Sequence, residues 1–202
     1  AQAGVSCCMG DIGVHAANLA ETISGLKITE LCSDLEPVVA GRVLDDDGTV
    51  LLKFNNGAKG VLISSQISVG EENNLNIRIF GTQTSLQWQQ QEPNTLLMKH
   101  TDKPTQLIRT GVGDFCAEAM NAMRTPAGHP EGYIEAFANI YRQFAQQVRD
   151  FSSTDPNLEE GDDAPGIVDA IRGMAFIENV VAASRSSQKW HPFLLSNINL
   201  DE

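Results

Sequence analysis

The chain has 202 residues, of which 42% are hydrophobic, and this is enough for one domain with a proper core or at most two small ones. Its formal net charge of −12 argues against a surface for nucleic acid or an anionic membrane, because such surfaces concentrate Lys and Arg. No apolar run approaches the roughly 18 residues of a membrane span, and the N-terminus lacks a signal-peptide layout. We therefore expect a cytoplasmic protein of one domain whose partners are small molecules or proteins.

The cysteines give no sign of a metal or disulfide framework. Cys7 and Cys8 are adjacent, Cys32 and Cys116 are isolated, and no Cys-x-x-Cys occurs. We expect reduced thiols and no bound metal. The chain does not begin with Met and runs almost at once into its first helix, so we expect it to be a piece of something longer.

The first predicted element is a helix over residues 11–24, which Gly25 closes. At helical spacing Asp11, His15 and Asn18 share a polar stripe that borders an apolar one. A carboxylate beside an imidazole can hold its tautomer and raise its basicity, so that the imidazole can take a proton from a substrate hydroxyl. The alternative is structural, with Asp11 as a helix cap or first-turn acid and His15 as a packed histidine.

The next eighty residues alternate with a period of two, which predicts strands joined by tight turns. Asn56-Gly57 between two apolar runs is a strong hairpin signal. The predicted strands cover residues 29–39, 49–54, 58–69, 75–81, 85–90, 95–99 and 106–109.

The last third is predicted to be helical, over residues 130–151 and 165–187. The first of these carries an apolar stripe at three-four spacing, which we assign to the core. We therefore predict an α/β (α+β) fold with an open, mostly antiparallel sheet and helices packed on one face.

Three further segments are candidate sites. Gly111-Val112-Gly113-Asp114 is similar to the start of a dinucleotide-binding loop, but the third small residue and a strand-helix-strand context are missing, so a turn before a short helix is expected. His129 lies at the mouth of the helix over residues 130–151, where a capped helix start is the alternative to a site. Residues 66–74 are unusually polar and are either a hairpin or a substrate-facing loop.

Several segments together resemble the C-terminal domain of the Gfo/Idh/MocA oxidoreductases, the relatives of glucose-fructose oxidoreductase and inositol dehydrogenase. The segments that carry the resemblance are Gly10-Asp11-Ile12-Gly13-Val14-His15, Glu71-Glu72-Asn73-Asn74 continuing to Phe80-Gly81, His129-Pro130-Glu131-Gly132-Tyr133-Ile134-Glu135-Ala136-Phe137 and Lys189-Trp190-His191-Pro192-Phe193.

The resemblance implies that residues 1–202 are a substrate-binding and oligomerisation domain, and that an N-terminal Rossmann domain, which binds NAD or NADP, is absent from this chain. It implies that Asp11 and His15 are catalytic, with His15 as the acid/base, and that His129 lies near a sugar or polyol substrate. We expect Asn18, on the same polar stripe as His15, to contact this substrate as well. It also implies a homo-oligomer assembled through the open sheet, and the chain alone is expected to be inactive. A non-catalytic ligand-binding or dimerisation module of the same fold is the alternative function.

Overall fold

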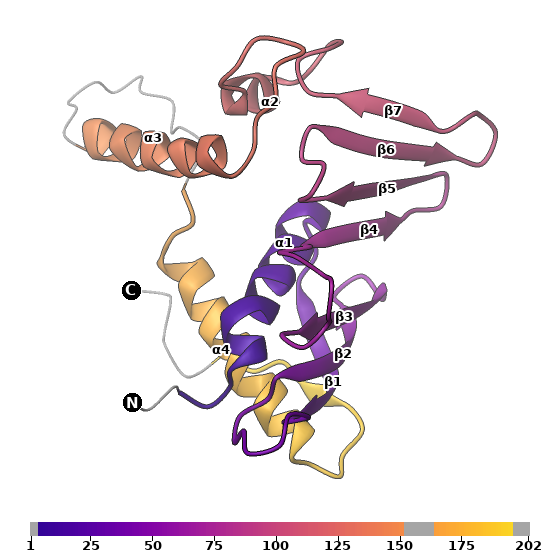
Figure 1. The fold of residues 1–202 in the computed structure, drawn as a ribbon, viewed down its shortest axis with the longest axis vertical. Helices are drawn as coiled ribbons and strands as arrows, with labels where there is room; N and C mark the ends of the chain where they lie inside the picture. Colours follow the sequence, from indigo (N-terminus) through magenta and orange to yellow (C-terminus); the bar gives the residue numbers. More distant parts are fainter. Residues whose placement is uncertain (1–3, 152–163, 196–202) are drawn as a thin grey trace. The chain divides into compact units, whose positions relative to one another are not determined.

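A computed structural model describes residues 4–151 and 164–195 of the chain. The chain divides into two compact units (Figure 1). The first unit comprises Ala1–Glu72 and Ile167–Glu202, and the second comprises Asn73–Gly166. Each unit contains an open antiparallel sheet together with helices, so the predicted α/β class is confirmed. None of the described helices combines the length and the apolar character that crossing a membrane requires.

The sheet of the first unit has the strand order β3-β2-β1-β8. Its strands are β1 (Ile28–Glu36), β2 (Asp47–Phe54), β3 (Lys59–Ser65) and β8 (His191–Pro192). Gly57 closes the β2–β3 turn with φ +86°, and its N–H donates to the Phe54 carbonyl, as the Asn-Gly signal predicted. Two residues of β8 are too short a run for an alternating pattern to reveal, so this strand was not predicted.

Helices cover one face of this sheet. The chain enters through a π-helical turn, η1 (Met9–Gly13), which continues into α1 (Val14–Ser24), and α4 (Ile167–Ser184) packs beside α1 and against β1 (Figure 1). Gly25 ends α1 in the left-handed conformation that favours glycine, and its N–H donates to Glu21 O. The fully buried core includes Met9, Leu31, Val50, Phe176 and Val180.

The second unit contains the strands β4 (Asn76–Phe80), β5 (Thr84–Gln89), β6 (Thr95–His100) and β7 (Gln106–Arg109), paired in sequence order. Its helices are α2 (Ala117–Ala122) and α3 (Tyr133–Phe151). The register aligns Ile77, Trp88, Leu96 and Ile108 across the four strands, so one face of the sheet is largely apolar.

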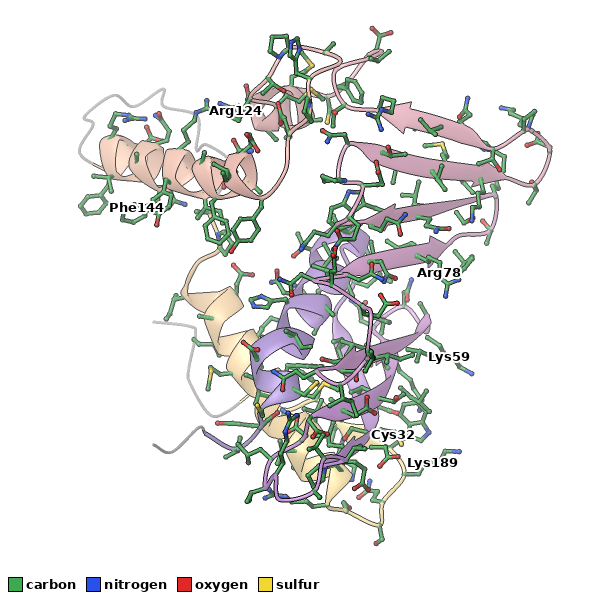
Figure 2. All side chains as sticks on the ribbon, in the orientation of Figure 1. Cys32, Lys59, Arg78, Arg124, Phe144 and Lys189 are labelled. Carbon is green, nitrogen blue, oxygen red and sulfur yellow. The ribbon has the colours of Figure 1, made fainter. Side chains whose placement is uncertain are left out.

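Two details differ from the sequence prediction. The strands form two hydrogen-bonded sheets instead of one: β1 to β3 pair together with β8, and β4 to β7 form the other sheet. The apolar stripe of α3 was assigned to the core, yet Phe137 is 45% exposed and Phe144 is 59% exposed and projects from α3 in Figure 2. Helical spacing shows only that a face is apolar; what covers that face depends on contacts distant in sequence.

Candidate functional site

The two residues predicted to be catalytic lie on one continuous helical segment. Asp11 belongs to the π-helical turn η1, and His15 belongs to the first turn of α1. Asn18 follows on α1, and all three residues are exposed. Single π-helical turns inside helices occur frequently at functional sites. The segment therefore presents an acid, an imidazole and an amide toward solvent in the first unit.

Asp45, in the loop before β2, anchors the backbone that leads into this segment. Its buried carboxylate accepts hydrogen bonds from Ser6 Oγ at 2.9 Å, Cys7 N at 3.0 Å and Met9 N at 2.9 Å. Cys8 N also donates to the Asp45 carbonyl at 3.0 Å. Buried polar groups normally find partners, and here one side chain serves three donors at the start of the helix. Asp45 thus fixes where the segment with Asp11 begins.

The Asp11 side chain is held from β3. Gln66 follows β3, and its Nε2 donates to Asp11 Oδ2 at 3.0 Å. Cys8 and Gly13 hold the N-cap positions of η1 and α1, so Asp11 is not a helix cap, but it does lie in the first turn of η1, as the structural alternative also allowed. His15 is exposed, which differs from the packed histidine of the same alternative. The sequence analysis included Gln66 only as part of the polar segment 66–74. Its contact with Asp11 could not be predicted there, because the two residues are 55 positions apart in the sequence.

Two buried groups beside this segment have shifted pKa values. Burial opposes ionisation of Asp46, but hydrogen bonds from Val38 N at 2.8 Å and Val39 N at 3.1 Å, together with Arg42, lower its pKa below the ordinary value. Burial raises the pKa of the Cys8 thiol, which lies 3.1 Å from Ser64 Oγ. Asp46 is therefore a charged structural anchor, and Cys8 is a neutral core thiol.

A small, partly open cavity lies between α1, α4 and the start of β1. Asn18, Glu21, Lys27, Arg172 and Phe176 are among its lining residues. Its volume of about 20 Å³ is enough for roughly one water molecule. Asn18 borders this cavity, but a sugar or polyol would need far more space, so the cavity is not a substrate site.

His129 belongs to the second unit, whereas Asp11, His15 and Asn18 belong to the first. The exposed imidazole of His129 has its Nδ1 3.1 Å from the Pro126 carbonyl oxygen. Next to it, Glu131 accepts hydrogen bonds from the backbone N–H groups of Arg124 and Thr125 and from Thr125 Oγ1. Burial opposes ionisation of Glu131, but these hydrogen bonds outweigh it and lower its pKa. The turn that presents His129 is thus stabilised by a charged acceptor.

The glycine segment after β7 does not fit a dinucleotide phosphate. Gly111 has φ +75°, and a Cβ at this position would lie 2.9 Å from the Ala127 Cα. Glycine is therefore required for close packing of the chain on itself, and α2, the helix that follows, has only six residues. Within residues 4–151 and 164–195, no three His, Cys, Asp or Glu side chains are grouped to hold a metal ion.

Comparison with known proteins supports the resemblance found in the sequence. Residues 2–87 match the family model described as the GFO/IDH/MocA C-terminal domain. An uncharacterized oxidoreductase of Bacillus subtilis (strain 168), YfiI, is 33% identical over 194 residues, which cover 95% of this chain and 49% of the relative. The chain therefore spans about half the length of the curated relative that it matches.

Solved structures agree. An oxidoreductase from Sinorhizobium meliloti is 39% identical with a TM-score of 0.83, over 91% of this chain and 51% of that one. An inositol dehydrogenase homolog from Azotobacter vinelandii, solved with NADH and myo-inositol, is 30% identical with a TM-score of 0.88, over 94% of this chain and 51% of that one. The resemblance to the Gfo/Idh/MocA oxidoreductases is thus confirmed: residues 2–87 match the model of their C-terminal domain, and the similarity to single oxidoreductases runs over most of this chain.

Proposed function

We propose that this chain supplies the substrate-binding and acid/base half of an NAD(P)-dependent dehydrogenase that oxidises a hydroxyl group of a sugar or polyol. The observation that supports this most is the placement of Asp11 and His15 on one exposed helical segment, with the Asp11 carboxylate held 3.0 Å from Gln66 Nε2. The solved relative named with NADH and myo-inositol supports the cofactor and substrate class.

In this proposal the imidazole of His15 accepts the proton of the substrate hydroxyl as the carbon is oxidised. Asp11 supports the positive charge that develops on the imidazole, because an anion beside it stabilises its protonated form. The nicotinamide cofactor supplies the hydride acceptor, and we propose that the residues that bind it lie outside this chain.

Asn18 and His129 are proposed as substrate contacts. Asn18 lies one turn beyond His15 on α1, where its amide can both donate to and accept from sugar hydroxyls. His129 is offered by a turn that Glu131 stabilises. With no nucleotide-binding fingerprint among its 202 residues, the chain alone is expected to show no turnover.

We also propose a homo-oligomer assembled through the open sheet of the second unit. The face with Ile77, Trp88, Leu96 and Ile108 is apolar, and none of the described residues between 73 and 151 is fully buried. Large apolar faces in soluble proteins commonly contact another domain or subunit. Sedimentation of the full-length protein at tens of micromolar should give a dimer or larger, and a clean monomer would contradict this. We place the protein in the cytoplasm, in keeping with its four unpaired cysteines.

The acid/base role is tested with His15→Ala in the full-length protein, assayed against a panel of polyols and sugars with NAD and with NADP. Turnover should fall by about 10² to 10⁴, with a much smaller change in substrate binding. Thermal stability should stay near that of the parent, because His15 is exposed. Near-normal turnover in this variant would show that His15 is not the acid/base, and no turnover by the parent itself would favour a non-catalytic module.

A further inference from the structure

We propose that Gln66 is a positioning residue that orients the Asp11 carboxylate for its work on His15. This inference rests on the proposed function of Asp11 and His15, and it assigns to the same site a residue that does not itself touch substrate. All of the contacts that carry it lie within the first unit.

The backbone of Gln66 is fixed independently of its side chain. Gln66 N donates to the carbonyl of Asp46 at 2.8 Å, which ties the residue after β3 to the loop before β2. Asp46 is itself held by Val38 N and Val39 N. The Gln66 Cα is therefore set by the sheet of the first unit, so its side chain starts from a defined place.

The amide of Gln66 is held at both of its polar atoms. Cys7 Sγ donates to Gln66 Oε1 at 3.4 Å, and Gln66 Nε2 donates to Asp11 Oδ2 at 3.0 Å. Because an amide has one acceptor end and one donor end, the thiol contact favours the orientation that turns the NH₂ group toward Asp11. Cys7 is in turn fixed through its backbone N–H, which donates to Asp45 Oδ1 at 3.0 Å.

A neutral donor suits this position. An Arg or Lys partner would neutralise the Asp11 carboxylate, whereas an amide orients it and leaves its negative charge in place. The bond from Gln66 engages Oδ2, and a carboxylate can accept further hydrogen bonds at its other oxygen. The charge of Asp11 thus stays available to support an imidazolium at His15.

The test uses the full-length protein and compares Gln66→Ala with Asp11→Asn and the double variant. The bond joins two exposed side chains, so Gln66→Ala should lower kcat by about two- to tenfold, with little change in KM. If Gln66 acts through Asp11, adding Gln66→Ala to the Asp11→Asn variant should lower kcat little further. If Gln66→Ala lowers kcat by the same factor in the parent and in the Asp11→Asn variant, the proposal is wrong.

Gln66→Glu removes the donor and adds a negative charge beside Asp11, so it should lower kcat more than Gln66→Ala does. Gln188→Glu is the matched control. It makes the same substitution at an amide that donates to Trp190 O and not to Asp11. It should leave kcat near that of the parent. A loss with Gln188→Glu as large as with Gln66→Glu would assign the effect to net charge and overturn the proposal.

A readout without activity separates this inference from the proposed function. In the 202-residue chain, the ¹³C resonance of the Asp11 carboxyl carbon should move in Gln66→Ala and stay in place in Gln188→Ala. If it moves while the full-length parent oxidises no substrate, the positioning contact stands and the proposed dehydrogenase function fails. If it does not move, the contact is absent in solution and the inference is wrong.

Discussion

The carboxylate of Glu21 on α1 accepts two hydrogen bonds from the guanidinium of Arg172 on α4, from Nε at 2.8 Å and from Nη2 at 2.5 Å. Glu21 Oε1 also accepts from Ile28 N at 2.7 Å, and the Arg172 guanidinium lies 4.9 Å from the ring centroid of Phe193. The side chains of Glu21 and Arg172 are only 10% and 16% exposed. This pair thus joins two helices, the first strand and the segment after β8, across 151 positions of sequence.

The pair predicts acid sensitivity of folding. Burial opposes ionisation of Glu21, but Arg172, Ile28 N and Lys27 outweigh it and lower its pKa below the ordinary 4.5. Its contribution is therefore fully present above that ordinary value and is lost as the pH falls through the lower pKa of the folded state. Glu21→Gln should lower the free energy of unfolding by about 3 kcal/mol at neutral pH. It should also make this free energy depend less on pH in the acid range, as measured by urea denaturation at a series of pH values.

Glu36→Gln is the control for this prediction, because Glu36 is exposed at the end of β1. This variant should keep both the free energy of unfolding and its decrease at acid pH close to those of the parent. A Glu21→Gln variant with an unchanged pH dependence would contradict the assignment.

The contact between η1 and the sheet predicts a steric effect at Gly48. A Cβ at Gly48 would lie 2.6 Å from both Leu35 Cδ2 and Met9 Cε, inside the core. Both atoms are the tips of flexible side chains that can shift, so Gly48→Ala should lower the unfolding free energy by about 1 kcal/mol, measured by thermal or urea denaturation. Gly10→Ala is the matched variant, since its nearest neighbour would lie at 3.9 Å, and it should be tolerated. Equal stability of both variants would argue against the packing of Met9 over Gly48.

The anchoring role of Asp45 predicts a local effect near the candidate site. Asp45→Asn keeps the size of the side chain but replaces one acceptor oxygen with an NH₂ donor, so either Cys7 N, which donates to Oδ1, or Met9 N, which donates to Oδ2, loses its acceptor. We expect a loss of about 1 to 3 kcal/mol and faster hydrogen exchange at the amide of Cys7 or of Met9. Unchanged exchange at these two amides would show that Asp45 does not hold the segment.

The thiol of Cys7 gives a further prediction. Cys7→Ser retains a donor for Gln66 Oε1, whereas Cys7→Ala removes it. The side-chain ¹⁵N resonance of Gln66 Nε2 should therefore shift in the alanine variant and stay closer to the parent in the serine variant. A similar shift in both variants would mean that the thiol does not orient the amide.

Local sequence patterns were enough to predict most of the elements. Alternation predicted β1 to β7, Asn56-Gly57 predicted the β2–β3 hairpin, and Gly25 predicted the end of α1, because each depends on residues that are neighbours in the chain. The same kind of information placed Asp11 and His15 on one helical segment. It also sufficed for the family resemblance, which lies in short runs of residues.

The tertiary structure decided what no local pattern contains. Gln66 meets Asp11 across 55 positions, and Arg172 meets Glu21 across 151, so neither pair leaves a periodic signal in the sequence. The division of the eight described strands between two sheets and the exposure of α3 likewise depend on long-range contacts. Sequence periodicity determines which face of an element is apolar, whereas the partner of that face is selected by the packing of the whole chain.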